Sequence, residues 1–349
     1  MAVGSLFLNV ASKLFGAAPA GRAGTVEPEL VKIAAEAIVE AVDPRLRVVS
    51  GYQRKIETGV VRTILHMREL AKELPHEPIE LSRDAWGADQ QLNAFFATAA
   101  DVPATLGRSA PLRAYFESPV NAGAADAYAL LGMLKIEREV FAPALVDGVL
   151  RHDVAQTTVS FSNHTLIAPA PDVMACRREV GVLIFKRLAA LALARIISLG
   201  ERATELEQRK AMLGARLRLL NLQRDGIEQV AGGGDESAEI ASIERELKST
   251  ADEFAETRTR LATLDTRLEH VNAIFNSPAD YVSLARVDLR VNKMGFKVAQ
   301  ESTETASDLK LSELSIGDGL KAVIAFVRCQ RADMPPRESL LAKAAREML

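Results

Sequence analysis

The strongest constraint on the fold is a pair of heptad-spaced apolar seams on either side of three consecutive glycines. Seam residues recur at coiled-coil spacing over residues 199–227 and again over residues 240–275, with Gly232-Gly233-Gly234 between them. Such a seam needs a partner helix, and a short loop makes the neighbouring arm the nearest one. The sequence therefore predicts an antiparallel coiled-coil hairpin over residues 172–278. The unbroken spacing of the second seam predicts that the returning arm is one uninterrupted helix.

The charges of the two arms support this prediction. Residues 195–229 carry seven basic and five acidic side chains, whereas residues 235–276 carry ten acidic and five basic ones. Arms of opposite net sign attract each other along their flanks. The polar seam positions Lys210 and Arg224 are expected to fix the register of the hairpin at some cost in stability.

The part of the chain before residue 155 has the 3.6-residue apolar period of amphipathic helices. Helices are expected over 27–42 and 52–73, and each ends near a proline. Ser82 is expected to cap a short helix. Further helices are predicted near 89–99, 105–116 and 124–140. Residues 26–155 are therefore interpreted as an all-helical domain.

Strand patterns begin at residue 156. Residues 157–168 are rich in β-branched side chains, and Ser162-Asn163-His164 is a plausible turn, which predicts a β-hairpin within 156–171. Strands are also expected over 282–291, with a shift of face near Ala285, over 309–316, and over 322–329 as a central strand. A two-stranded hairpin is marginally stable alone, so we expect it to join this sheet. A final helix is expected to run to Leu349, closing a C-terminal region of residues 279–349.

The predicted fold class is thus α+β and mainly α. An N-terminal helical domain precedes a long antiparallel coiled-coil hairpin, which projects from a small, mostly antiparallel β-sheet. The length of 349 residues is enough for two or three ordinary domains.

Residues 1–25 are predicted to form an amphipathic helix and a linker. Five of the residues on its apolar stripe are candidates for docking: Leu6, Phe7, Val10, Leu14 and Phe15. Three destinations stay open, namely a membrane surface, a partner protein and the chain's own domain. Since the sequence has no uninterrupted apolar run of 18 residues, we expect a cytoplasmic protein, with peripheral contact to the inner membrane as an alternative.

Catalytic, metal and cofactor sites are not predicted. The sequence has no HExxH motif and no cluster of cysteine and histidine, and the two cysteines are far apart. Ser160 and His164 lack a nearby acid that would orient the imidazole. The net charge of −3 gives no bulk attraction to nucleic acid, so no nucleic-acid partner is expected.

The spacing of Arg286 and Arg290 resembles the RxxxR stretch of PilZ-type nucleotide-sensing domains. The second stretch of that type, D/NxSxxG, is not matched, because residues 313–317 read Glu-Leu-Ser-Ile-Gly. The resemblance implies a site for an anionic small molecule at Arg286 and Arg290. His164 is a further candidate ligand-binding residue.

Across most of its length the chain resembles an uncharacterised proteobacterial family of conserved proteins. The stretches that carry the resemblance are 43–47, 157–166 and 289–295, which read DPRLR, TTVSFSNHTL and LRVNKMG. The family has no function attached to it, so the resemblance implies no activity.

Three functions follow as hypotheses. The first is a non-catalytic interaction or scaffold protein that uses the hairpin to bind an unknown protein partner, with a homodimer as an open alternative. The second is a sensing module that binds an anionic ligand on the C-terminal sheet. The third is an enzyme whose site lies between the helical domain and the sheet, near His152, His164 and Arg290, which requires those residues to share a deep pocket.

Overall fold

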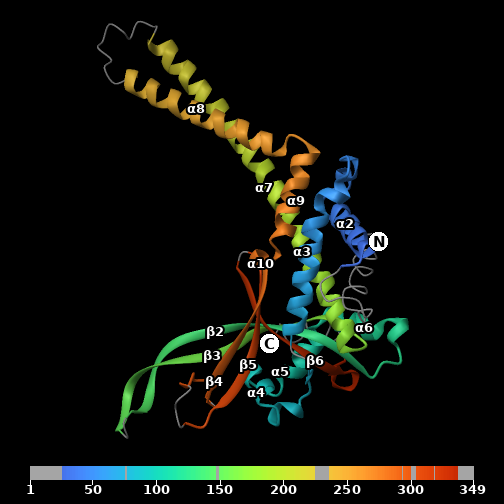
Figure 1. Cartoon of the computed structure of the whole chain (residues 1–349). Helices are drawn as coiled ribbons and strands as arrows, with labels where there is room; N and C mark the ends of the chain where they lie inside the picture. The colour runs from blue at the N-terminus through green and yellow to red at the C-terminus, as the bar shows by residue number, and fades with distance from the viewer. Residues whose placement is uncertain are drawn as a thin grey trace. The chain divides into compact units, whose positions relative to one another are not determined.

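The computed structural model describes residues 26–74, 77–146, 149–224, 236–292, 294–299, 304–317 and 319–336. It shows an α+β fold that is mainly α (Figure 1). The predicted N-terminal helix over residues 3–15, the glycine loop at 232–234 and the predicted C-terminal helix after residue 336 lie outside the described residues.

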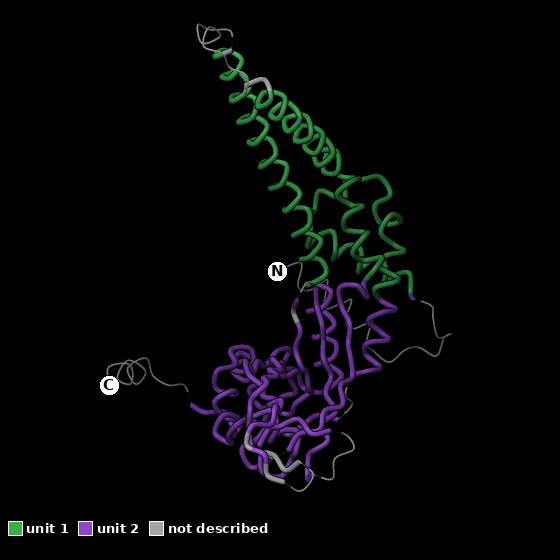
Figure 2. Tube along the Cα trace, turned by 90° about the vertical axis from the view of Figure 1, so that its left-hand side faces the viewer, with its two compact units in different colours: residues 1–6, 27–63, 186–277 green, residues 7–26, 64–185, 278–349 purple. Residues whose placement is uncertain are grey.

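The chain divides into two compact units, coloured separately in Figure 2. The first contains residues 27–63 and 186–277, and the second contains residues 64–185 and 278–336. Two helices, α3 (Tyr52–Glu73) and α7 (Val173–Arg224), contribute residues to both units.

The first unit begins with α2 (Pro28–Val42), which starts at a proline and buries Leu30, Ile38 and Val39. Proline is tolerated in the first turn because its missing N–H has no partner there. Asp43 then caps the 3₁₀ helix η1 (Pro44–Val48), accepting a hydrogen bond from the Arg45 amide at 3.0 Å. The helices predicted over 27–42 and 52–73 are confirmed.

The hairpin of the first unit is formed by α7 and α8 (Glu236–Leu261), which run antiparallel. Three ion pairs join them, and their members step by seven residues in opposite directions along the two helices: Arg202–Glu253, Arg209–Glu246 and Arg216–Glu239. Seven residues are two helical turns, so all three pairs lie on one flank. The facing sides bury predicted seam residues: Leu206, Leu213, Ile240, Ile243, Thr250 and Thr257.

The prediction of an uninterrupted returning helix is wrong. The helix ends at Leu261, and Thr263 caps a new helix, α9 (Leu264–Asn276), through reciprocal bonds with Thr266. A threonine side chain satisfies free amides at a helix start, so it favours a new start over continuation. Helix α9 then packs on α3, where the buried Thr63 hydroxyl donates to the Phe275 carbonyl at 2.8 Å.

Short helices open the second unit. They are η2 (Ala85–Gly87), α4 (Gln90–Phe95), α5 (Asp101–Arg108), α6 (Ala110–Glu117) and η3 (Pro119–Asn121). Side-chain oxygens accept hydrogen bonds from free amides near several of these helix starts: before η2, whose N-cap residue is Asp84, the Ser82 hydroxyl accepts from the Ala85 amide at 3.1 Å. Asp89 caps α4 and Ser109 caps α6 in the same way.

The helix predicted over 124–140 is wrong, and so is an all-helical domain that extends to residue 155. This segment is the strand β2 (Asp126–Val146). Ala127, Ala129, Leu131 and Met133 are all buried, which is the two-residue period of a strand. The helix-favouring composition is overridden because these alternating side chains enter the sheet's core.

The small hairpin predicted within 156–171 is also wrong. Residues 149–170 form one strand, β3 (Val149–Ala170), that pairs antiparallel with β2. The supposed turn is a β-bulge, since the register shifts between the pairs Leu134↔Ser162 and Gly132↔Thr165. Asn163 has φ of 55°, a conformation that asparagine tolerates better than most residues. The expectation that this segment joins the C-terminal sheet is confirmed.

The sheet contains β4 (Val282–Val291), β5 (Ser307–Ile316) and β6 (Leu320–Gln330) in the order β3-β2-β6-β5-β4. The strand predicted to be central, β6, lies in the middle, and the short strand β1 (Ile79–Glu80) pairs with it in parallel. The shift of face predicted near Ala285 is absent, because β4 and β5 pair without interruption from Val282↔Ile316 to Val291↔Ser307. Leu284, Arg286 and Asp288 therefore share one face of the sheet.

Helices cover both faces of the sheet in this unit. The face that bears Leu131, Leu311 and Val327 packs against α4, α5 and α6, with Phe96 and Phe116 in the same cluster. The opposite face bears Leu284, Leu314 and Ile324, which approach the second-unit parts of α3 and α7. The two edges of the sheet are joined by isolated bridges, in which Phe296 pairs with Thr158 and Lys297 pairs with Val291.

Candidate functional site

A cleft opens where β5 separates from β6. The two strands pair from Ile316↔Leu320 to Ser312↔Ile324, and β6 then pairs with β1 at Val327 instead. The space left between the diverging strands is a cavity of about 590 Å³. Small-molecule sites in proteins have volumes of roughly 300–1,000 Å³, so the cleft is of ligand size.

The cleft combines an apolar floor with a charged rim. Buried residues of the floor are Leu74, Phe95, Leu311, Ile324, Ala325 and Phe326. The strands β4 and β5 contribute Arg286, Asp288 and Lys310, while the end of α3 and the segment after it contribute Glu73 and Glu77. Polar and apolar side chains are therefore equally prominent in the lining of the cleft.

The two cations of the rim lie side by side on the sheet. Ser312 is opposite Arg286 and Lys310 is opposite Asp288, so Arg286 and Lys310 are diagonal neighbours on one face. The Arg286 guanidinium donates to the Glu73 carbonyl oxygen at 3.3 Å. Among the residues the structure describes, neither cation forms an ion pair with a carboxylate. Both charges are therefore available to one bound anion.

Arg290 is not part of this cleft, although the sequence pairs it with Arg286. Its guanidinium forms an ion pair with Asp308 at 3.2 Å and donates to the Ala299 carbonyl at 3.3 Å. The cleft's second cation is Lys310, which sequence reasoning missed. Only the strand register could have revealed it, because Lys310 is 24 positions from Arg286 and no motif links them.

His164 lies in a different cavity, of about 520 Å³, that Arg108, Asn163 and Ile167 also line. Its Nε2 atom is 2.7 Å from the Phe95 carbonyl, so this nitrogen donates, and its ring stacks on Phe96 with 4.3 Å between centroids. Burial lowers the pKa of His164. These contacts hold the ring as part of the packing beside α4.

The enzyme site expected near His152, His164 and Arg290 is not assembled in this arrangement. His152 and His164 are twelve residues apart in the same strand, β3. At about 3.3 Å per residue they are separated by about 40 Å along that strand. Two residues that far apart in one extended strand do not act on one small substrate.

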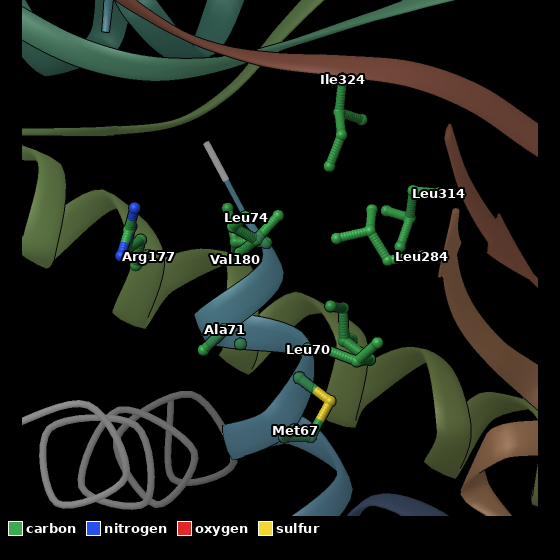
Figure 3. A pocket seen from close by; sticks show the side chains of 11 residues that line it. Met67, Leu70, Ala71, Leu74, Arg177, Val180, Leu284, Leu314 and Ile324 are labelled. Carbon is green, nitrogen blue, oxygen red and sulfur yellow. The ribbon is translucent and has the colours of Figure 1, made fainter. Parts of the chain in front are cut away.

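A second, apolar pocket lies beside the cleft and shares Leu74 and Ile324 with it. Figure 3 shows Met67 and Leu70 of α3, Val180 of α7, and Leu284 and Leu314 of the sheet among the residues that line it. Arg177 is its one charged lining residue and lies 5.4 Å from the centre of the Phe326 ring. With a volume of about 20 Å³, this pocket is a packing gap about the size of one water molecule.

In the first unit, the outer half of α7 exposes a stripe of apolar side chains. Met212, Leu219 and Leu222 are 71%, 57% and 73% exposed, and Ala215 between them is also exposed. At about 100° per residue these four positions lie on one side of the helix, roughly opposite the seam that faces α8. We refer to Met212, Ala215, Leu219 and Leu222 as the outer stripe.

The outer stripe lies in a basic stretch of the chain. Residues 208–224 contain five basic residues and no acidic one. Two of these, Arg209 and Arg216, form ion pairs with α8, and Lys210 lies 5.5 Å from the Phe254 ring centre. The exposed Arg218 flanks the stripe and forms no ion pair with any residue the structure describes.

The docking residues predicted in the N-terminal helix, from Leu6 to Phe15, lie outside the described residues. Within the part of the chain that the structure describes, no helix is both long and apolar enough to span a bilayer. The same residues hold no group of three or more His, Cys, Asp and Glu side chains arranged to bind a metal ion.

Comparisons of the chain with protein-family models, with curated proteins and with solved structures gave no significant match.

Proposed function

We propose that this protein is a non-catalytic interaction protein whose α7–α8 hairpin is a coiled-coil arm that binds an amphipathic helix of a partner. The outer stripe carries the proposal. It exposes three large apolar side chains on a helix whose opposite side is already packed against α8. Contiguous exposed apolar side chains on a folded protein commonly mark an interaction site.

The spacing of the outer stripe supports a helix as the partner element. Its positions advance by three, four and three residues, which is the a/d spacing of a coiled-coil seam. Ala215, the small residue in the stripe, leaves room for a side chain of the incoming helix. A third helix on this side would give α7 a partner on each face.

Charge supports a partner with acidic flanks. Arg218 lies beside the stripe, and the whole stretch 208–224 lacks acidic residues. A helix with glutamate or aspartate beside its apolar seam would pair with these flanks. A second copy of the same stripe would instead place basic flanks against each other, which disfavours a homodimer through this surface.

The cysteines support a cytoplasmic setting for the interaction. Cys176 and Cys329 are both buried free thiols. Proteins that fold in oxidising compartments commonly use their cysteines in disulfides.

Site-specific photo-crosslinking tests the proposal. A benzophenone amino acid is placed at Met212 or at Leu219 in the full-length protein, expressed in its native cells, and the crosslinked peptides are sequenced. Both positions are expected to capture one partner through an amphipathic, acid-flanked helix. The same amino acid at Lys248, an exposed position on α8, is the control and is expected not to capture it.

A triple variant gives a second, independent test. Met212→Gln, Leu219→Gln and Leu222→Gln together are expected to abolish capture from a crosslinker at Ala215, while the far-ultraviolet circular dichroism stays unchanged. Because all three side chains are exposed, the helix tolerates these changes. Capture that persists in the triple variant, or crosslinks only to a second copy of the chain, would contradict the proposal.

A further inference from the structure

We propose that the cleft between β5 and β6 binds a zwitterionic ligand with an apolar side chain, namely a free amino acid or a very short peptide. The inference goes beyond the interaction function, since the cleft lies in the second unit and the outer stripe in the first. It also replaces the expectation of an anionic, nucleotide-like ligand at Arg286 and Arg290.

The charge of the rim selects the ligand class. Two cations, Arg286 and Lys310, come from the β4–β5 wall, and three carboxylates line the cleft as well. A ligand with several negative charges would be repelled by Glu73, Glu77 and Asp288. A ligand with one carboxylate and one ammonium matches both sets of groups.

The arrangement of the cations fits a single carboxylate. Arg286 and Lys310 are diagonal neighbours on the same sheet face, a spacing that long side chains can bridge. Arg286 donates to a main-chain carbonyl, so that contact leaves its positive charge without a compensating anion. A ligand carboxylate would accept hydrogen bonds from both cations.

The carboxylates from the α3 side fit the ammonium. Glu73 ends α3 and Glu77 follows shortly after it, and both line the cleft with the strand cations. In a free amino acid the ammonium and the carboxylate are attached to one carbon, so the two sets of groups must lie close together, and the Arg286 guanidinium is 3.3 Å from the Glu73 carbonyl at the end of α3. Both ends of the ligand would then be neutralised without burying an unpaired charge.

The floor of the cleft supplies the site for an apolar side chain. Phe95, Leu311 and Phe326 are buried apolar residues that line it. An aliphatic or aromatic side chain placed on this floor would be removed from contact with water. This transfer favours binding roughly in proportion to the apolar area covered. The volume of about 590 Å³ accommodates an amino acid or a dipeptide.

Isothermal titration calorimetry of the full-length protein tests the ligand class. The ligands are leucine, phenylalanine and the dipeptide leucyl-phenylalanine. Three analogues accompany them: N-acetylphenylalanine lacks the ammonium, phenylalaninamide lacks the carboxylate, and ATP is a polyanion. At least one zwitterion is expected to bind, with at least tenfold lower affinity for the matching analogues and no binding of ATP.

Variants locate the binding in the cleft. Lys310→Met and Arg286→Met are each expected to weaken binding of the zwitterion at least tenfold, and Glu77→Gln is expected to weaken it severalfold. Lys321→Met is the matched control, since Lys321 is an exposed lysine of β6 that does not line the cleft. A thermal melt of each variant establishes that it is folded before its affinity is compared.

Three results would overturn the inference. The first is no binding of any of the three zwitterions. The second is equal binding of a zwitterion and its blocked analogue. The third is unchanged affinity in folded Lys310→Met and Arg286→Met proteins. Preference for the dipeptide over the free amino acids would assign the site to short peptides, and the opposite preference would assign it to amino acids.

Discussion

Arg202 of α7 and Glu253 of α8, which are 51 positions apart in the chain, form an ion pair with 2.8 Å between Nη2 and Oε1. The pairs Arg209–Glu246 and Arg216–Glu239 repeat this relationship two and four turns farther along α7. These three ion pairs form a ladder, which fixes which turn of α7 faces which turn of α8.

Charge reversal in the middle of this ladder is expected to weaken the hairpin. Arg209→Glu should lower the free energy of unfolding by roughly 0.5–1 kcal/mol, because both side chains are partly exposed and screened by water. Adding Glu246→Arg should restore most of the loss. Urea denaturation of both single variants and the double variant measures the coupling, and a coupling of zero would show that the pair does not contribute.

Gly59 is expected to be indispensable in α3. A Cβ atom there would lie 2.8 Å from Asn272 Oδ1 and 3.2 Å from the carbonyl carbon of Phe275, both in α9. Gly59→Ala should therefore destabilise the protein, although alanine favours helix by about 1 kcal/mol. Gly200→Ala is the control, since no atom lies within 4 Å of its added Cβ, and it should be stabilising. Thermal melts that rank the two variants in the opposite order would contradict this packing.

His164 is expected to make stability depend on pH. Burial is the largest cause that lowers its pKa, and the hydrogen bond to the Phe95 carbonyl opposes it. As the pH falls below about 6.5, the unfolded chain protonates this histidine while the folded chain keeps it neutral. Stability should therefore fall from about pH 6.5 down to the folded pKa. Chemical denaturation between pH 5 and pH 8 gives the free energy of unfolding at each pH. This free energy should change less with pH in His164→Gln than in the unchanged protein.

The two cysteines are expected to be unreactive in the folded protein. Burial raises the pKa of both Cys176 and Cys329 to about 12, so neither forms the thiolate that attacks an alkylating agent. Iodoacetamide at pH 8 should add nothing to the native protein and two groups in guanidinium chloride. Rapid modification of the native protein, read by intact mass, would show that these thiols are accessible.

The sequence predicted well those elements whose pattern is local. The amphipathic helices α2 and α3 and the bounds of the strand β4 are set by periodicity and capping chemistry within about 20 residues. For residues 126–146 the same reasoning predicted the wrong secondary structure. Their alanine, leucine and glutamate content favours helix, and only pairing with β3 and β6 makes a strand the better state.

The residues of the candidate sites were also predicted only in part. Arg286 stands out in the sequence, but its neighbour Lys310 is brought beside it by the β4–β5 register alone. The outer stripe was likewise not predicted, because the seam of α7 shows which side faces α8 but not whether the apolar side chains on the opposite side are covered by another part of the fold.

By itself, the sequence determined the two antiparallel helical arms and the strands that follow them, since heptad spacing and alternating residues act through near neighbours. Only the tertiary structure decided that residues 126–170 form two long paired strands, that β5 leaves β6 at Ser312, and that Arg290 is tied to Asp308. Those features depend on contacts between segments far apart in the chain. The free energy of such contacts cannot be inferred from a local sequence pattern.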